Sequence, residues 1–431
     1  MIRTTLAVAP PEHARPRLCR WGIPTRAVTQ TKHSDHPATS GNGGAPTHDP
    51  GRVVVIRNPH TLIFGTGCAS RCADDLIARG LKRTFIVTGP HTRSLTDATS
   101  DRLRGAGLHV TICDRIAREP TVDMFRTSLA AARDARCDSV IGFGGGSPMD
   151  VAKLVAALLN SKQDIRDVFG IGKLAARGAY LACVPTTAGT GSEVSPNSVI
   201  LDEAESLKKA VISPHLVADA AYVDPMLTVS VPREVTAATG MDALTHCIEA
   251  YANRFAHPIV DVYALEGIRL IAANLAKAVE NGHDIPARTA VALGSLYGGM
   301  CLGPVNTAAV HALSYPLGSE FHVAHGVSNA VLLPHVLEFN LPAAPQRYAA
   351  IAMAMGAEAA SDDHKTAARG LQRIRDLSRR VGIPAHMSQL SVPKDAVERM
   401  ARSAMTVTRL LERNVREVHF EDAIEIYRRA M

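Results

Sequence analysis

Aromatic residues are scarce in this sequence, and it has no long apolar segment. Phe, Trp and Tyr make up 4% of the 431 residues, and there is a single Trp. Few aromatic side chains are therefore available for recognition of nucleic-acid bases by stacking. No apolar run approaches the roughly 20 residues that are needed to span a bilayer. We expect neither a nucleic acid nor a membrane among the partners of this protein.

Paired cysteines are also absent from the sequence. The eight cysteines are scattered without C-x-x-C spacing, and a chain of this length does not need disulfides for stability. The net charge of +6 does not indicate a polyanion partner, because about half of the excess lies in residues 1–50. These features are typical of a reduced, cytoplasmic protein.

Residues 1–51 differ in composition from the rest of the chain. They are rich in Pro, Thr, His and Arg and have no apolar periodicity, so we predict a disordered extension. An Arg-bearing, acid-poor start is also compatible with a transit peptide. We favour an extension without a targeting role.

From residue 52 onward, short apolar runs alternate with amphipathic stretches of helical length. This repetition predicts an α/β domain over 52–230, with a parallel sheet covered by helices on both faces. From 231 to 431 the strand signals stop, and long helical periodicities predict an all-α domain. The expected strands are RVVVIR and TLIFG around an Asn58-Pro59 turn, followed by TFIVTG, GLHVTIC, DSVIGFGGG, LACVPTT, NSVILD, KKAVIS and AYVDP.

A glycine-rich loop follows the run DSVIGF. Gly144, Gly145 and Gly146 lack a β-carbon, so a pyrophosphate could approach the backbone, and the N-terminus of the next helix would attract its charge. We expect Ser147 to be the N-cap of that helix and Pro148 its first residue. The alternative is a tight strand-to-helix turn that binds nothing.

A second loop, VPTTAGTGSEVS, crowds hydroxyl groups at the end of another expected strand. Open α/β sheets bind ligands at the carboxyl ends of their strands. We therefore expect the two loops to form one extended dinucleotide site, although a solvated Ser/Thr turn is the simpler interpretation of the second loop alone. The hydroxyl residues concerned are Thr186, Thr187, Thr190 and Ser195.

Four residues of the second half have the chemistry of a metal site. Asp242 and His246 are four residues apart, so on a helix they share one face, and His311 and His325 follow downstream. One carboxylate and three imidazoles suit Fe²⁺, Zn²⁺ or a related ion. The alternative is that Asp242 caps or pairs locally and that the histidines are core or surface residues.

Taken in order, these motifs resemble those of the iron-containing (group III) alcohol dehydrogenase family, over roughly residues 53–430. The matching segments are GGGSPMDVAK, PTTAGTGSE, Asp224 to Thr228, GMDALTHCIEAY and the HA-x-x-x-PLG…HGV-x-N pattern. The resemblance implies a dehydroquinate synthase-like fold, with a nucleotide-binding α/β domain, an all-α domain and commonly a homodimer. It places Fe²⁺ (or Zn²⁺) on Asp242, His246, His311 and His325. It places NAD or NADP against Gly89, Gly144, Gly145, Gly146, Ser147, Asp150, Thr186, Thr187, Thr190, Ser195 and Lys208.

Two positions depart from the family pattern. Many members have a histidine four residues after the one at 311, where this chain has Tyr315, whose ordinary pKa near 10 makes it a poor base. Gly89 stands where NAD-preferring members often have an Asp for the ribose, so nothing there repels the 2′-phosphate of NADP. We take Tyr315 and His322 as the candidate catalytic residues, His322 as a proton relay.

The expected reaction is the reversible oxidation of a small alcohol to an aldehyde or ketone, with hydride transfer to NAD(P). Three alternatives remain open. One is a related redox activity, either maleylacetate reduction or hydroxyacid-oxoacid transhydrogenation. Another is a metal- and NAD-dependent lyase of the dehydroquinate synthase type, and the third is a binding protein without activity.

Overall fold

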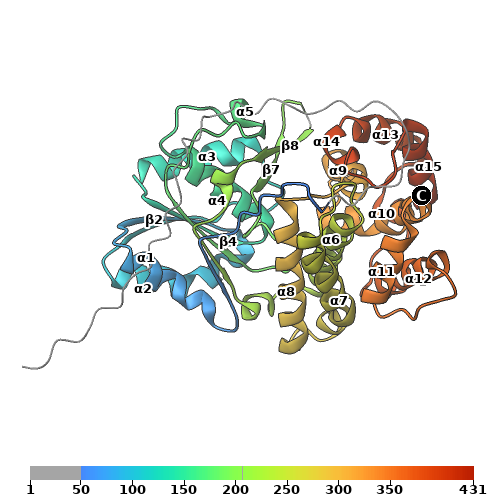
Figure 1. The fold of residues 1–431 in the computed structure, drawn as a ribbon. Helices are drawn as coiled ribbons and strands as arrows, with labels where there is room; N and C mark the ends of the chain where they lie inside the picture. Colours follow the sequence, from blue (N-terminus) through green and yellow to red (C-terminus); the bar gives the residue numbers. More distant parts are fainter. Residues whose placement is uncertain (1–49, 206) are drawn as a thin grey trace, which may run out of the picture. The chain divides into compact units, whose positions relative to one another are not determined.

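The structure is a computed structural model that describes residues 50–205 and 207–431. The predicted extension over residues 1–51 therefore lies almost entirely outside the described residues. The strands all belong to the first half of the described chain, and helices fill the second half (Figure 1). In the part of the chain that the structure describes, no helix is both long and apolar enough to cross a bilayer.

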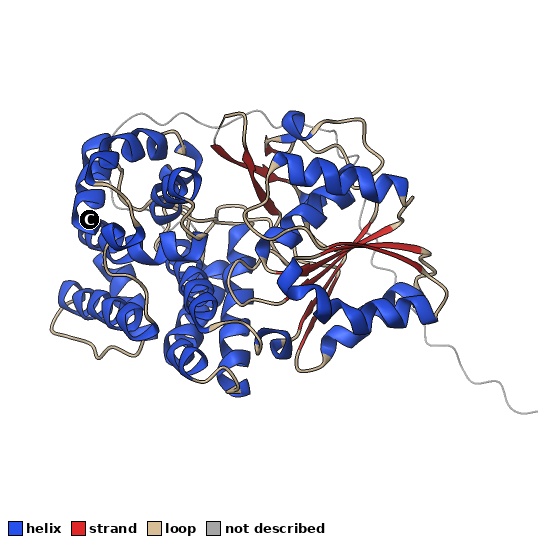
Figure 2. Ribbon diagram, turned by 180° about the vertical axis from the view of Figure 1, so that it is seen from behind, coloured by secondary structure: helices blue, strands red, loops and turns tan. Residues whose placement is uncertain are grey.

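The main sheet has six parallel strands in the order β1-β9-β6-β4-β2-β3. Alternate residues of each strand point to opposite faces. Phe85 and Val87 pack with α3 and α4, whereas Ile86 packs with α1 and α2, so helices cover both faces as expected (Figure 2). The strands are β1 (Thr61–Phe64), β2 (Arg83–Val87), β3 (His109–Cys113), β4 (Ser139–Gly144), β6 (Tyr180–Pro185) and β9 (Ala220–Val223). The helices are α1 (Arg71–Ala78), α2 (Asp97–Gly105), α3 (Val122–Asp134), α4 (Gly146–Leu158) and α5 (Ile165–Val168).

Three expectations about this half were wrong. The segment RVVVIR is not a strand, and Val53 and Val55 are 87% and 57% exposed. NSVILD and KKAVIS are strands as predicted, β7 (Asn197–Asp202) and β8 (Leu207–Ile212), but they do not belong to the parallel sheet. They form an antiparallel pair that joins β5 (Gly170–Ile171) in a separate sheet. Burial alternates along β7, as is typical of a strand covered on one face only. Helix α4 begins at Gly146 with Gly145 as N-cap, so Ser147 and Pro148 lie in its first turn instead of starting it.

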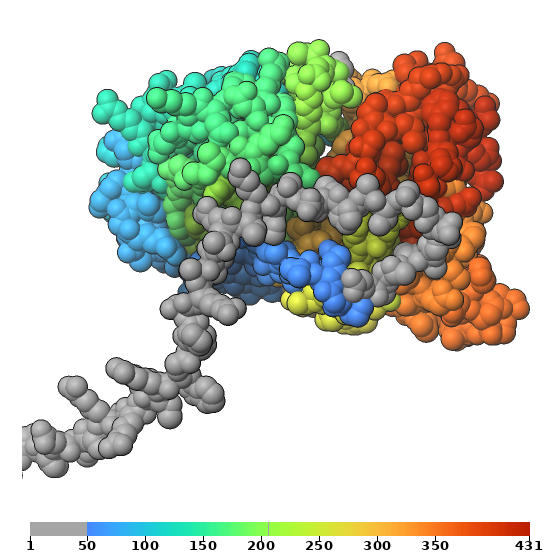
Figure 3. Space-filling model, turned by 45° about the horizontal axis from the view of Figure 1, so that its top comes forward, coloured from blue at the N-terminus to red at the C-terminus, as the bar shows by residue number. Residues whose placement is uncertain are grey.

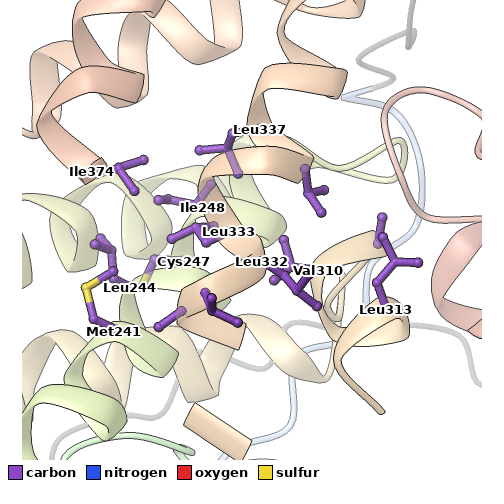
Figure 4. Packing of buried hydrophobic residues seen from close by; sticks show 14 of the residues in the cluster. Met241, Leu244, Cys247, Ile248, Val310, Leu313, Leu332, Leu333, Leu337 and Ile374 are labelled. Atoms are coloured by element: carbon purple, nitrogen blue, oxygen red, sulfur yellow. The ribbon is translucent and has the colours of Figure 1, made fainter. Parts of the chain in front are cut away.

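Helices α6 to α15 pack around one large apolar core. Figure 4 shows Ile248 of α6 close to Leu333 and Leu337 of α10, within this core. The helices are α6 (Arg233–Tyr251), α7 (Pro258–Glu280), α8 (Ile285–Leu302), α9 (Ala309–Phe321), α10 (His325–Asn340), α11 (Pro345–Ala354), α12 (Asp363–Val381), α13 (Val397–Met405), α14 (Thr408–Leu411) and α15 (Phe420–Ala430).

The all-α prediction for residues 231–431 includes α9 and α10, but neither helix was singled out from the sequence. Each contains an interior proline, Pro316 or Pro334, which cannot donate a hydrogen bond to the preceding turn. In α9 the hydroxyl of Tyr427, on α15, donates to the carbonyl of Leu313 at 2.6 Å. Tertiary contacts thus support a helix that its local sequence disfavours.

Candidate metal and nucleotide site

A cavity of about 970 Å³ lies between the second sheet and glycine loop on one side and α6, α9 and α10 on the other. Figure 3 shows the surface hollowed between the light-green β7–β8 region and the red helices near residue 400. Of the residues expected at a site, those lining the cavity are Gly146, Ser147, Asp150, Thr190, Ser195, Lys208, His246, His311, Tyr315, His322 and His325. Gly89, Gly144, Gly145, Thr186, Thr187 and Asp242 are not part of its lining.

One carboxylate oxygen lies at the centre of the histidine cluster. The Oδ1 atom of Asp242 is 3.9 Å from Nε2 of His246, 3.6 Å from Nε2 of His311 and 3.7 Å from Nε2 of His325. Asp242, His311 and His325 form the tighter group, with their ligand atoms within 4.8 Å of one another. Two ligands at about 2.1 Å from one ion, on neighbouring tetrahedral corners, are about 3.4 Å apart. Asp242, His311 and His325 therefore fit a divalent cation with little adjustment, and His246 lies next to this group.

The protonation states of Asp242, His246 and His325 also suit a cation. Burial opposes ionisation of Asp242, but His246, His325 and His311 together lower its pKa well below the ordinary range. Burial lowers the pKa of His246, and it lowers that of His325 to about 3. Asp242 is thus an anion at neutral pH, while these two imidazoles are neutral and keep a lone pair for a ligand.

Glu249 orients His311, and we did not predict this role from the sequence. Its Oε2 is 2.5 Å from Nδ1 of His311, and its Oε1 accepts the backbone N–H of Val310 at 2.6 Å. Burial opposes protonation of His311, but Glu249 and Asp242 raise its pKa to about 9. With Nδ1 held by Glu249, Nε2 is left to face Asp242. The signal was present, because Asp242, His246 and Glu249 recur at the helical spacing of one face of α6.

Asn329, on α10, lies inside the cluster. Its Nδ2 is 2.7 Å from Oδ1 of Asp242, 3.1 Å from Nε2 of His311 and 3.2 Å from Nε2 of His325. An amide NH₂ has two hydrogens and cannot satisfy three acceptors at once. The convergence of acceptors on one point is therefore better matched by a cation than by this amide.

The two predicted nucleotide loops touch each other. A β-carbon on Gly146 would lie 2.7 Å from Cγ2 of Thr190. Half-buried Asp150 accepts hydrogen bonds from Ser192 Oγ at 2.6 Å and from the Val199 N–H at 2.8 Å. Asp150 therefore holds the second loop against α4. Gly89 lies against a different segment. It packs on the backbone of Ile116, and a β-carbon added to Gly89 would lie 2.7 Å from the Ile116 carbonyl oxygen.

Tyr315 and His322 both lie on the cavity wall, at different depths. Burial raises the pKa of Tyr315 further from neutrality, although the positive charge of Arg409 opposes this. The Lys208 Nζ lies 5.7 Å from the centre of the Tyr315 ring. His322 is exposed at the end of α9 with a φ of 56°, so its imidazole is in contact with solvent.

A parallel α/β sheet, a glycine loop and a carboxylate–histidine cluster around one cavity are features of metal-dependent nucleotide oxidoreductases. Residues 59–225 match the family described as iron-containing alcohol dehydrogenase, and residues 236–431 match its C-terminal part. The chain belongs to the iron-containing alcohol dehydrogenase family.

Known relatives cover most of the chain. Long-chain-alcohol dehydrogenase 1 of Geobacillus thermodenitrificans (strain NG80-2) is 38% identical over 384 residues, which are 88% of this chain and 97% of that protein. The crystal structure of 1,3-propanediol oxidoreductase has a TM-score of 0.85 and 34% identity, and the match covers 88% of this chain and 100% of that one. Sulfoacetaldehyde reductase from Bifidobacterium kashiwanohense, solved with NAD⁺, has a TM-score of 0.79 and 28% identity, over 88% and 99% of the two chains.

Proposed function

We propose that this protein interconverts small alcohols and their aldehydes or ketones, using NAD(P) and a divalent metal ion. Family membership places the chain among the metal-dependent alcohol and aldehyde oxidoreductases. The observation that carries the proposal is the convergence of buried Asp242 with three histidines that line the cavity, which also reaches the glycine loop.

Asp242, His246, His311 and His325 are proposed to hold the metal. Fe²⁺ is the ion that the family name indicates, and Zn²⁺ suits the same ligands. A divalent ion in such a site polarises a hydroxyl or carbonyl oxygen of a substrate. The side chains supply one negative charge, and Glu249 fixes the imidazole of His311.

The nucleotide is proposed to lie along the two loops, where the backbone of Gly146 and Ser147 begins α4. The positive end of that helix would face the pyrophosphate, and the nicotinamide would exchange a hydride with the substrate. The relative solved with NAD⁺ supports this cofactor. NADP remains compatible, because Gly89 carries no carboxylate that would repel a 2′-phosphate.

Further roles are proposed for the cavity wall and for the whole chain. Tyr315 shapes the pocket, since its raised pKa disfavours proton abstraction. Exposed His322 relays protons to solvent.

All seven cysteines of the described residues are free, which suits a reducing compartment such as the cytoplasm. The homodimer common in the family can be checked by light scattering.

The test is a panel of alcohols and aldehydes, assayed with NAD(H) and NADP(H) after reconstitution with Fe²⁺ or Zn²⁺. Absence of turnover across the panel would refute the proposed function. The same preparations allow the metal ligands to be tested.

His311→Ala should remove metal binding and turnover together, because one ligand and the link to Glu249 are lost. Metal content is measured by mass spectrometry after dialysis, alongside nucleotide absorbance. His335→Ala is the matched control, since His335 is a half-buried histidine of α10 outside the cluster. A variant at 311 that turns over without metal would contradict the assignment.

A further inference from the structure

The guanidinium group of Arg409 places a positive charge at the wall of the cavity. Arg409 belongs to the short helix α14 and lines the cavity together with Tyr315, His311 and His325. Its positive charge lowers the pKa of the Tyr315 hydroxyl, against the effect of burial. Its Nη1 is buried and has no hydrogen-bond partner among the described residues.

The charge of Arg409 is also unbalanced within the structure. No carboxylate of the described residues lies within ion-pair distance of it, whereas Lys208, across the Tyr315 ring, is paired with Glu119. Asp150, another acid on the cavity wall, is already bound to Ser192 and Val199. A buried guanidinium N–H without an acceptor is costly, so a bound molecule that supplies the acceptor would remove that cost.

The position of the Arg409 guanidinium relative to the histidine cluster limits the kind of substrate that the cavity can bind. Tyr315 follows His311 by one helical turn, so their β-carbons are about 5–6 Å apart on the same face. Arg409 lines the same cavity, and its charge acts on the Tyr315 hydroxyl. A molecule with its reacting oxygen near the histidines would reach Arg409 through a short carbon chain. A planar carboxylate matches the guanidinium fork better than a hydroxyl does.

We propose that Arg409 binds a carboxylate at the far end of the substrate, so that short hydroxy acids and their aldehyde acids are the preferred substrate class. This inference rests on the proposed function, because it concerns the substrate of the same site. Arg409 acts here as a specificity residue. Tyr315 lines the same cavity beside it.

The experiment compares matched substrates in the metal-reconstituted enzyme. The ratio of kcat/KM for 4-oxobutanoate over butanal is measured for the unaltered protein and for Arg409→Gln, Arg409→Lys and Arg402→Gln. Arg402 is the control, because its side chain is 68% exposed and it pairs with Glu398. Phosphonoacetaldehyde is included to distinguish a phosphonate site from a carboxylate site.

We expect the ratio to fall about 100-fold in Arg409→Gln, as when a charged hydrogen-bond partner is lost. Arg409→Lys should restore part of it, and Arg402→Gln should leave it unchanged. An equal loss for both aldehydes would overturn the inference, as would an effect confined to the KM of the nucleotide. A preference for phosphonoacetaldehyde over 4-oxobutanoate would overturn the assignment to a carboxylate.

A binding measurement makes the inference independent of turnover. Titration calorimetry with butanoate and butanamide, on protein loaded with Zn²⁺ and NAD⁺, should show tighter binding of the acid, and the difference should disappear in Arg409→Gln. Equal binding of the two compounds to the unaltered protein would refute the carboxylate site. Failure of the proposed function is distinct, because it would appear as no turnover of any aldehyde.

Discussion

At the scale of single residues, Glu249 links the backbone of α9 to the histidine cluster. One of its oxygens receives the Val310 N–H and the other contacts His311 Nδ1. Its carboxylate is therefore satisfied on both sides, and the His311 ring has one orientation. A carboxylate behind a metal-binding imidazole makes the imidazole more basic and fixes its tautomer.

Glu249→Gln should weaken metal binding about 10- to 100-fold, because the amide is neutral and presents a single acceptor oxygen. Competition with a fluorescent chelator measures the affinity directly. Glu266→Gln is the control, since that carboxylate is 40% exposed and pairs with Arg269 at the surface. Unchanged metal affinity in Glu249→Gln would show that His311 does not depend on this contact.

At the scale of elements, the glycine loop and the second loop form one joint surface. The absence of a side chain at Gly146 lets Thr190 approach the start of α4, and Thr190 Oγ1 accepts the Ser192 N–H at 3.3 Å. The shape of the proposed pyrophosphate site thus depends on two loops that are distant in sequence. A change in one loop is transmitted to the other by direct contact.

Gly146→Ala should raise the KM for the nucleotide about tenfold, because the new methyl would push Thr190 out of place. Thermal unfolding should change little, since the loop borders a cavity. Steady-state kinetics at saturating alcohol give the KM. Gly105→Ala is the control, because a β-carbon there would meet nothing within 4 Å. An unaltered KM would exclude Gly146 from the nucleotide site.

Elements with a regular apolar pattern could be predicted from the sequence, as the strands of the main sheet and helices α6 and α7 illustrate. Helices α9 and α10 could not, because Pro316 and Pro334 interrupt their pattern and distant contacts compensate. RVVVIR was misleading because its apolar pattern predicts a strand, whereas Val53 and Val55 remain exposed and the segment forms none. In the site, Asp242 and His246 share a helical face, but only tertiary folding brings Asn329 to the histidine cluster and Arg409 to the cavity.

At the scale of the whole molecule, glycines allow the α/β part and the helical part to touch backbone to backbone. Gly191, with a φ of +59°, lies against Gly299 of α8, where a β-carbon on Gly299 would be 2.6 Å from the Gly191 carbonyl oxygen. Gly298, its neighbour, packs near the β-carbon of His246. Helix α8 therefore contacts both the second loop, through Gly299, and α6, the helix that carries Asp242, through Gly298.

Gly299→Ala should destabilise the protein by about 1–3 kcal/mol, because the methyl meets backbone that cannot rotate away. Helix propensity alone would increase the free energy of unfolding by up to about 1 kcal/mol, so the sign of the change in this free energy separates the two effects. Urea unfolding measures it. Gly303→Ala, with its nearest atoms at 3.5 Å, is the matched control. A stabilised Gly299→Ala would mean that the two parts do not meet closely there.

The hydrogen bond from Tyr427 to Leu313 also bears on the order of events during synthesis. His311 leaves the ribosome well before Tyr427, which lies 114 residues beyond Leu313. Until α15 has been made, the proline-interrupted helix that carries His311 lacks this support. We therefore expect the nascent chain to acquire its metal late, after translation has passed α15, so that a ribosome-stalled chain ending before residue 420 would retain little of it.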